Sequence, residues 1–314
     1  MNQAAKAPLL SIVIPSFNEA ENIPLVVDEV SKVIPAGFDY ELLFVDDGSN
    51  DSSPLVLKKL AGENARVKFL FLSRNFGHQH ALKAGLDYAK GDAVICMDGD
   101  LQHPPAIIPV MIEKWWKESY DVVYTIRKED KELSFLKRKT SALFYRLMNA
   151  FTDIELKQGA ADFRLIDRKL VEEIKRMNDP FLFIRGLIPW MGFKQFELEY
   201  QPGKRLHGVT KYTFRKMFRF AINGITSFSI KPLRFAVFMG FFISLLSFIY
   251  GVYAIAIFWF DDRAISGWAS MITSVVFLGG LQLIILGIIG EYIGKIYVQL
   301  KNRPTYIVKE KNFN

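Results

Sequence analysis

The chain has 314 residues, half of them apolar, which is enough for one large domain or two modest ones with a buried core. Its formal net charge is +7, and the excess is uneven, because residues 200–260 contain eight Lys or Arg and no Asp or Glu. We therefore expect an anionic partner for that stretch. The single cysteine, Cys96, excludes a framework of internal disulfides, and without a Cys/His cluster any metal has to be held by oxygen atoms.

The first hundred residues alternate between short apolar runs and helix-like segments. Apolar runs at residues 10–14, 41–45 and 67–72 are each followed by a helical pattern, and a fourth strand is predicted over residues 92–97. Such βαβ alternation predicts an α/β fold with a parallel sheet that is covered by helices on both faces. Ligands of these sheets bind at the carboxyl ends of the strands, so the loops that follow the four strands are the places to look for a site.

Two helix starts carry capping signals. Asn18 is well placed to cap the first helix, with Glu21 three residues later as its capping-box partner. Ser49 or Asn50 is similarly placed to cap a helix that begins near Ser52. Both loops are therefore expected to lead directly into helices.

Two long uncharged segments occur near the C-terminus. Residues 235–260 and 268–290 contain no charged residue, and each exceeds the ~20 residues that cross a bilayer. Buried core helices are the alternative, but two such segments joined by a short charged linker favour a pair of membrane spans. Basic residues flank the pair on both sides, so the positive-inside rule places both ends, and with them the N-terminal domain, in the cytoplasm. The flanking residues are Lys231, Arg234, Lys295, Lys301 and Arg303.

Two further segments, residues 133–151 and 210–232, are basic and amphipathic at helical spacing. Basic amphipathic helices beside a membrane anchor commonly lie in the interface between lipid and water. For the second segment, which leads directly into a span, we favour the interface. For the first, packing of the apolar face on the α/β core is an equally good interpretation.

Asp98, Gly99 and Asp100 follow the fourth predicted strand. Two carboxylates one residue apart at a strand–loop junction can converge on a hard divalent cation, and Gln102 is close enough to contribute. Mg²⁺ or Mn²⁺ bound there would bridge to a diphosphate and neutralise the charge that builds on a leaving group. An acidic pair in a turn is more often a solvated cap, so its position after a parallel strand is what favours the metal site.

The loops after the first two strands are also polar. Asp46 and Asp47 follow the second strand, where a carboxylate can accept hydrogen bonds from a nucleobase edge or from ribose hydroxyls. Pro15, Asn18 and Glu19 occupy the matching place after the first strand. Neither a GxGxxG motif nor a Walker A sequence occurs, which disfavours a dinucleotide site and a P-loop ATP site.

Five motifs that occur in order make the sequence similar to a known family. They are Ser11-Ile-Val-Ile-Pro-Ser-Phe-Asn-Glu19, the turn Val45-Asp-Asp-Gly-Ser49, Arg74-Asn-Phe-Gly77, Asp98-Gly-Asp-Leu-Gln102 and Ala161-Asp-Phe-Arg164. Together they resemble the inverting GT-A glycosyltransferases of family 2, whose catalytic domain is Rossmann-like with a mainly parallel sheet. Nearly the whole chain looks like the polyprenyl-phosphate glycosyltransferases: dolichyl-phosphate mannose synthase and, more closely, bacterial undecaprenyl-phosphate glucosyltransferases with two C-terminal spans. The Gln-x-x-Arg-Trp signature of the processive branch is absent, so a polymerase is not expected.

The resemblance implies roles for the motif residues. A nucleotide-sugar pocket would be formed by Pro15, Asn18, Glu19, Asp46, Asp47, Arg74, Asp98 and Gly99. The metal and the diphosphate would be held by Asp98, Asp100 and Gln102. Arg127 and Arg138 match positions that meet phosphates, and the acceptor phosphate would be bound by Arg138, Lys204, Arg205 and Lys211.

Asp162 matches the position of the family's usual general base. A lipid phosphate, however, is already anionic near pH 7 and needs no base, only cationic side chains that hold it beside the diphosphate. Asp162 is kept as catalytic together with Asp100, Arg127 and Arg138. It would alternatively orient the sugar hydroxyls or pair with Arg164, and the sequence leaves these interpretations open. No histidine is given a role in proton transfer.

We expect an enzyme that transfers a sugar with inversion onto undecaprenyl phosphate or another polyprenyl phosphate. The two-span resemblance alone favours UDP-glucose as the donor. The alternatives are an enzyme that uses GDP-mannose, a non-catalytic membrane sensor or scaffold that binds nucleotide sugars, and a flippase for lipid-linked sugars. The expected partners are the nucleotide sugar, the polyprenyl lipid, the membrane and further copies of the chain in a tetramer, without nucleic acid.

The expected organisation has four parts. Residues 1–209 would form the cytoplasmic GT-A domain, and residues 210–232 a juxtamembrane amphipathic helix. Residues 233–294 would form two transmembrane helices, and residues 295–314 a cytoplasmic tail. The protein would thus be a multi-pass protein of the inner membrane.

Overall fold

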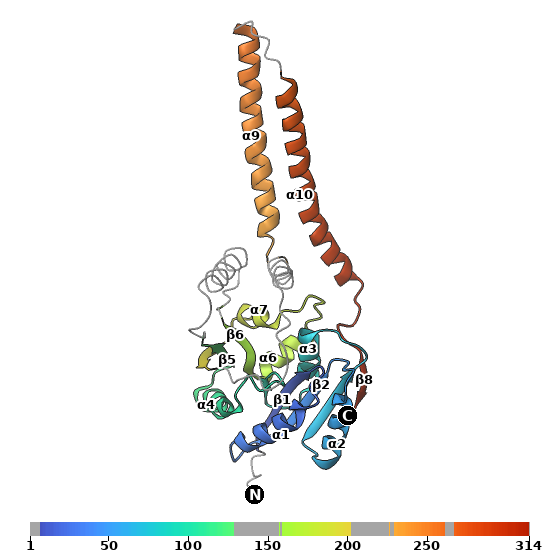
Figure 1. Ribbon diagram of the computed structural model, residues 1–314. Coiled ribbons are helices and arrows are strands. Elements are labelled where there is room, and N and C mark those ends of the chain that lie inside the picture. Colours follow the sequence, from blue (N-terminus) through green and yellow to red (C-terminus); the bar gives the residue numbers. More distant parts are fainter. Residues whose placement is uncertain are drawn as a thin grey trace. The chain divides into compact units, whose positions relative to one another are not determined.

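The computed structural model describes residues 7–128, 157, 159–201, 226, 229–260 and 267–313, without the side chains of residues 254–260, 268 and 269. The amphipathic helix predicted at residues 133–151 lies outside the described residues, and so does nearly all of the one predicted at 210–232. The chain divides into two compact units, one built around a sheet and one that contains two long helices (Figure 1).

The first unit is an α/β domain around an eight-stranded sheet with the strand order β7-β5-β6-β4-β1-β2-β3-β8. Pairing is parallel from β4 through β1 and β2 to β3, and again between β5 and β7. β6 and β8 pair antiparallel with their neighbours. The four predicted strands are thereby confirmed as the parallel centre of the sheet. The strands are β1 Leu9–Ser16, β2 Asp39–Asp46, β3 Val67–Leu72, β4 Ala93–Cys96, β5 Val122–Arg127, β6 Ala160–Asp167, β7 Gln195–Tyr200 and β8 Val308–Lys311.

Helices cover both faces of this sheet because apolar residues point alternately to either side of the central strands. Ile12 and Ile14 of β1 belong to the core on one face, and Val13 belongs to the core on the other. The first core is closed by α1 Asn22–Val33, α2 Ser53–Glu63, the turn η1 Pro105–Ile107 and α4 Ile108–Glu118. The second is closed by α3 His78–Tyr88, α6 Arg168–Arg176 and α7 Ile184–Trp190.

α3 lies very close to β1, and a glycine permits this approach. A Cβ added at Gly85 would stand 2.1 Å from Cγ1 of Val13, so any larger residue would push the helix away from the strand. The close packing fixes the start of α3, where His78 and Gln79 are located, relative to the sheet.

The end of the chain differs from the tail expected at residues 295–314. The last helix continues to Leu300, and Val308–Lys311 then pairs with β3 as β8. Asn312 extends the pairing, because its Oδ1 accepts a hydrogen bond from the Phe69 amide at 2.8 Å and its Nδ2 donates to the Val67 carbonyl at 3.2 Å. Tyr306, Val308 and Phe313 pack on the second core, so the residues from Arg303 onward belong to the first unit.

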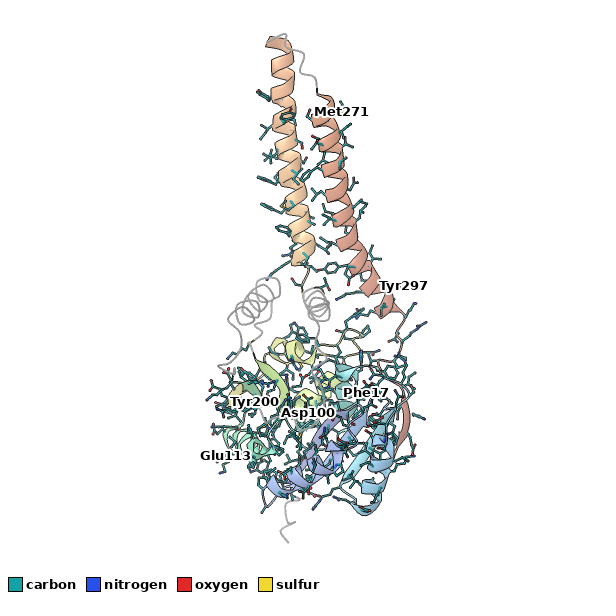
Figure 2. The ribbon with its side chains drawn as sticks, in the orientation of Figure 1. Phe17, Asp100, Glu113, Tyr200, Met271 and Tyr297 are labelled. Atoms are coloured by element: carbon teal, nitrogen blue, oxygen red, sulfur yellow. The ribbon has the colours of Figure 1, made fainter. Side chains whose placement is uncertain are left out.

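The second unit contains α9 Lys231–Phe260 and α10 Trp268–Leu300. By length and composition, both helices could cross a membrane, over Lys231–Tyr253 and Ser270–Leu300. Their described apolar side chains project outward and are mostly exposed, as Figure 2 shows for Met271 of α10. The Tyr292 hydroxyl donates a hydrogen bond to the Ser229 carbonyl at 2.7 Å, which ties α10 to the residue that lies two positions before α9.

Candidate active site

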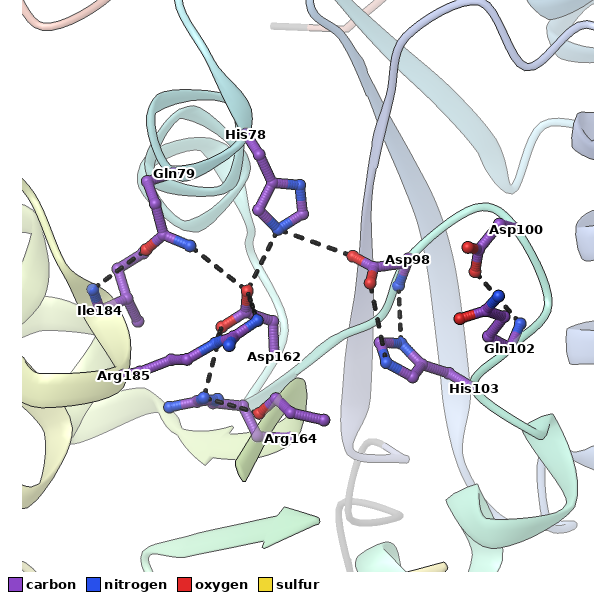
Figure 3. A network of polar contacts seen from close by, with 11 residues as sticks. His78, Gln79, Asp98, Asp100, Gln102, His103, Asp162, Arg164, Ile184 and Arg185 are labelled. Carbon is purple, nitrogen blue, oxygen red and sulfur yellow. Dashed lines mark hydrogen bonds and ion pairs between the residues drawn. The ribbon is translucent and has the colours of Figure 1, made fainter. Parts of the chain in front are cut away.

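The predicted site residues of the five motifs gather where the central strands end. β1 and β2 end opposite each other, and β4 ends at Cys96, which pairs with Arg164 of the antiparallel strand β6. Asp98 follows Cys96 by two positions, and Asp162 precedes Arg164 by two positions. The antiparallel pairing therefore brings Asp162 to the edge of the sheet where the loop after β4 begins (Figure 3).

Asp98 and Asp100 lie in the tight loop after β4. The Asp98 side chain is 37% exposed, whereas Asp100 is buried and its Oδ1 accepts a hydrogen bond from the Gln102 amide at 3.1 Å. Leu101, between Asp100 and Gln102, has a φ of 56°. A left-handed backbone costs a leucine ~1–3 kcal/mol, and such strain concentrates at functional sites. The loop thus holds one accessible carboxylate beside one that is buried.

His103 supports this loop. Its Nδ1 accepts a hydrogen bond from the Asp98 amide at 3.0 Å, and because an amide N–H only donates, the neutral ring carries its proton on Nε2. Burial lowers the pKa of His103 and so favours this neutral form. The ring also stacks on Phe163, with the centroids 5.1 Å apart. His103 is therefore a support for the Asp98 backbone.

Asp162 is buried at the centre of a polar network (Figure 3). Arg185 donates to both carboxylate oxygens, from Nε to Oδ1 at 2.7 Å and from Nη2 to Oδ2 at 2.8 Å. Nη2 of Arg164 lies 3.4 Å from Oδ1, and Nε2 of Gln79 lies 3.3 Å from Oδ2. Burial raises the pKa of Asp162, but Arg185, His78 and Arg164 together lower it well below its usual value. Asp162 does pair with Arg164, one of the interpretations left open by the sequence, but this ion pair is one of several contacts that Asp162 makes.

His78 joins the Asp162 network to the Asp98 loop. Its Nε2 lies 3.3 Å from Oδ2 of Asp162 and 3.6 Å from Oδ1 of Asp98. Burial lowers the pKa of His78, but the hydrogen bond to Asp162 and the negative charges of both carboxylates raise it above its usual value on balance. The side chain is 42% exposed, so a ligand in front of the loop can reach it.

Three residues of this network were not predicted from the sequence: His78, Gln79 and Arg185. The first two directly follow the Arg74–Gly77 motif and begin α3, and that position is a signal that could have identified them. The Gln79 side chain also accepts a hydrogen bond from the Ile184 amide at 3.1 Å, which fixes the start of α7. Arg185 stands in α7, outside any of the five motifs.

Asp46 and Asp47 are both buried, but they differ in their partners. Asp47 accepts two backbone hydrogen bonds, from the amides of Phe76 at 2.7 Å and Gly77 at 2.9 Å, and so holds the loop before α3. Asp46 accepts one from the Ser49 amide at 2.9 Å, while its Oδ2 has no hydrogen-bond partner among the described residues. Burial raises the pKa of both carboxyl groups. Of the two residues, Asp46 is therefore the one whose side chain, through Oδ2, could accept a hydrogen bond from a ligand.

The two predicted helix caps are wrong. α1 begins at Asn22 with Glu21 at its N-cap position and no capping side-chain hydrogen bond, and α2 likewise begins after Ser52 without one. Asn18, at a φ of 55°, instead donates from its amide to Oγ of Ser49 at 2.8 Å and accepts at Oδ1 from the Asn50 amide at 2.9 Å. These polar residues tie the loops of β1 and β2 to each other, because cross-loop partners satisfy them better than the helix ends do.

The other predicted residues that the structure describes lie around the same edge. Pro15 is buried in β1, and a Cβ added at Gly99 would lie 3.9 Å from its carbonyl oxygen. Glu19 donates from its amide to Oγ of Ser53 at 3.0 Å. The Arg74 guanidinium stands 4.0 Å from the centre of the Phe76 ring, and Arg127 is exposed at the end of β5. Four predicted cations lie outside the described residues: Arg138, Lys204, Arg205 and Lys211.

The donor atoms of the loop suit a hard cation that shares its coordination with a substrate. Within the described parts of the chain, no group of three or more His, Cys, Asp or Glu side chains could enclose a metal. Asp98 and Asp100 supply carboxylate oxygens, and Mg²⁺ sites of this kind use one or two carboxylates and complete the shell with water and phosphate oxygens. The residues present therefore fit a divalent cation that binds together with a diphosphate.

A mainly parallel, Rossmann-like sheet with a two-carboxylate loop at its carboxyl edge is the arrangement expected of a GT-A domain. The model of glycosyl transferase family 2 matches residues 11–175, and the model of the GtrB C-terminal hairpin matches residues 231–296. The chain belongs to glycosyl transferase family 2 and is a glycosyltransferase.

Relatives match nearly the full chain. An uncharacterized glycosyltransferase of Bacillus subtilis, YkcC, is 46% identical over 96% of this chain and 93% of its own. A prophage-derived bactoprenol glucosyl transferase of Shigella flexneri is 40% identical over 96% of this chain and 98% of its own. Among solved structures, a mannosyltransferase of Pyrobaculum calidifontis in complex with GDP-Man and Mn²⁺ is 14% identical, with a TM-score of 0.49 over 95% of this chain and 88% of that one.

Proposed function

We propose that the protein transfers a sugar from a nucleoside diphosphate onto the phosphate of a polyprenyl lipid, with UDP-glucose as the donor. The observation that best supports this proposal is the Asp98–Asp100 loop at the carboxyl edge of the sheet. There the accessible carboxylate of Asp98 lies beside His78 and the network that includes Arg185. Relatives named bactoprenol glucosyl transferase, 40% identical over almost the whole chain, support the acceptor class and the choice of sugar. The two long apolar helices support a lipid acceptor in a membrane.

Asp98 and Asp100, with Gln102, would hold Mg²⁺ or Mn²⁺ against the diphosphate. The cation, when bound, supplies positive charge that stabilises the departing nucleoside diphosphate. Asp46 would accept a hydrogen bond from the nucleobase, because its Oδ2 is buried and lacks a partner among the described residues. An N–H of the base, such as N3–H of uracil, is the complementary donor.

The remaining predicted residues would complete the donor and acceptor sites. Pro15, Asn18, Glu19 and Gly99 would shape the nucleotide pocket, and Arg74 would contribute a positive charge beside it. Arg127 would meet phosphate oxygens from the end of β5. Arg138, Lys204, Arg205 and Lys211 would bind the acceptor phosphate, consistent with the basic excess of residues 200–260.

The chemistry is a displacement at the anomeric carbon of the sugar. An oxygen of the lipid phosphate forms a bond to that carbon as the bond to the diphosphate oxygen breaks, so the configuration inverts. The leaving nucleoside diphosphate takes the electron pair, and no proton has to move because the attacking phosphate is already ionised. The protein has to bring two anions together, which is the task of cationic side chains.

The domain with the sheet would lie in the cytoplasm, with α9 and α10 crossing the inner membrane as a hairpin. The basic residues on both flanks of the apolar segments favour this orientation. A tetramer also stays a prediction, in which small residues of α10 such as Gly279 and Gly280 would allow close helix packing.

The test is the transfer of radiolabelled sugar from a panel of UDP- and GDP-sugars into undecaprenyl phosphate, with and without Mg²⁺ or Mn²⁺. The Asp100→Ala variant is compared with Asp28→Ala, which removes an exposed carboxylate of α1. We expect metal-dependent label in the lipid phase from UDP-glucose, a loss of ~100-fold or more with Asp100→Ala and no change with Asp28→Ala. Label from another donor would correct the sugar, and nucleotide binding without any lipid label would refute the acceptor.

A further inference from the structure

We propose that Asp162 is a positioning residue that holds Arg185 and His78 against the reacting phosphates, and that it does not take up a proton. Arg185 and His78 would then be catalytic residues that touch phosphate oxygens. The inference rests on the proposed function, because it requires a phosphate acceptor.

The first support is that both oxygens of Asp162 are already occupied. Two strong hydrogen bonds from Arg185 and a longer one from Arg164 reach the carboxylate, and His78 and Gln79 approach Oδ2 at 3.3 Å. A carboxylate offers about four lone-pair directions, and five contacts compete for them here. A general base needs an open lone pair directed at its substrate. The lone pairs of Asp162 are instead directed at side chains of the protein.

The second support is the charge of the network. Asp162, Arg164 and Arg185 together carry one negative and two positive charges. Asp162 and Arg164 are buried, but the side chains of Arg185 and His78 are 35% and 42% exposed. The positive excess therefore faces the solvent side, next to Asp98. Such a surface attracts an anion, and an arginine held through both Nε and Nη2 presents its charge in a fixed place.

The third support is that the network joins three separate elements. Asp162 comes from β6, Arg185 from α7 and His78 from the first turn of α3 (Figure 3). Without the carboxylate, Arg164 and Arg185 would repel each other, and His78 would lose its partner at 3.3 Å. Asp162 thus compensates this repulsion and fixes Arg185 and His78 beside the Asp98 loop.

The role in the reaction follows from the balance of charge. The attacking oxygen of the lipid phosphate and the departing oxygen of the diphosphate are both anionic while the sugar passes between them. Arg185 and His78 would stabilise these oxygens as hydrogen-bond donors without losing their protons. The bond to the acceptor oxygen forms and the bond to the diphosphate breaks, with no proton leaving the acceptor for Asp162.

The experiment compares Asp162→Asn, Arg185→Lys, Arg185→Gln, His78→Gln and the double variant Asp162→Asn with Arg185→Gln. Single-turnover transfer to undecaprenyl phosphate is measured in H₂O and in D₂O, and KM for each substrate is measured separately. The matched control is Arg176→Gln, which removes an arginine from α6 whose side chain is 73% exposed. Nucleotide binding and thermal unfolding of every variant report whether the fold is retained.

We expect Arg185→Gln to lower the transfer rate ~100-fold and Arg185→Lys to recover part of it, because lysine restores the charge without the fork. The double variant should be no slower than the slower single variant, because Asp162 acts through Arg185. His78→Gln, at an exposed position, should slow transfer while leaving unfolding unchanged. The rate should be equal in both solvents, and Arg176→Gln should behave like the native protein.

The inference is overturned if transfer is slower in D₂O, if the double variant shows the product of both single losses, or if His78→Gln is fully active. An inactive native protein in the lipid assay is a different result, since it would refute the proposed acceptor. If Asp162→Asn unfolds, Arg185→Lys and His78→Gln still decide, because both leave the buried carboxylate in place.

Discussion

At the scale of single residues, neighbouring side chains of the same type carry different tasks. Asp46 and Asp47 are both buried at the end of β2, yet Asp47 gives both oxygens to the backbone amides of Phe76 and Gly77 while Asp46 keeps one oxygen without a described partner. The sequence motif alone does not distinguish the roles of the two carboxylates. The partners that tell them apart lie 29 and 30 positions further along the chain.

This difference predicts two distinct defects. Asp47→Asn places an amide N–H₂ against a backbone donor, so we expect a loss of ~1–3 kcal/mol in the free energy of unfolding. Asp46→Asn keeps the acceptor for Ser49 but replaces the free oxygen by a donor, so we expect UDP to bind ~10-fold or more weakly with a smaller loss of stability. Calorimetry with UDP and thermal unfolding measure the two quantities. Equal effects of both variants on UDP binding would show that this division of tasks is wrong.

Much of the site was predictable at this scale because the motif residues directly follow apolar strands. The strand-end rule predicted that Asp46 and Asp98 come to the same edge of the sheet, and the strand register confirms it. Arg185 could not be predicted in the same way, since it lies 23 positions from Asp162 on another element and its place depends on how α7 packs. The helix caps failed for a related reason, because tertiary partners across two loops replaced the local ones.

At the scale of elements, β8 shows what composition alone does not reveal. Its sequence, Val-Lys-Glu-Lys, contains one apolar residue and has neither the length nor the alternation of a predicted strand. It is a strand because β3 offers an unpaired edge, and the charged residues suit the outer side of a sheet. Tyr306 and Phe313, on either side of it, supply the apolar anchors that the strand itself lacks.

The edge pairing predicts a measurable stability contribution from Asn312. Asn312→Ala removes an acceptor for the Phe69 amide and a donor to the Val67 carbonyl, so we expect a loss of about 1 kcal/mol in the free energy of unfolding. Lys309→Ala, at an exposed position of the same strand, serves as the control. Thermal unfolding of the purified protein measures both. An Asn312→Ala variant as stable as its control would mean that β8 contributes little to the sheet.

At the scale of the whole molecule, the family membership and the two apolar helices agree with the predicted combination of a GT-A domain and a membrane hairpin. The pairing of β8 with β3 adds a constraint on the path of the chain. Strands β1 to β7, which precede α9, and strand β8, which follows α10, belong to the same sheet and the same unit. If both helices span the bilayer, the chain has to return to the side it left.

Labelling of introduced cysteines tests this path. The native Cys96 is buried and its thiol pKa is raised to about 12 by burial, so it should not react with a membrane-impermeant maleimide. Lys59→Cys in α2 and Lys309→Cys in β8, both exposed, should label from the same side of sealed vesicles. Arg263→Cys, between the two apolar segments, should label only from the opposite side. Labelling of the first two from different sides would contradict a return of the chain.

The pairing of β8 also has a consequence for biosynthesis. Translation delivers β1 to β7 first and the strand that completes the sheet last, after both apolar helices have left the ribosome. Until then the edge of β3 stays open, and the surface that Tyr306 and Phe313 will cover is exposed. If the two helices enter the lipid as they emerge, their insertion precedes the pairing of β8 with β3, so the catalytic domain closes only after its anchor is in place.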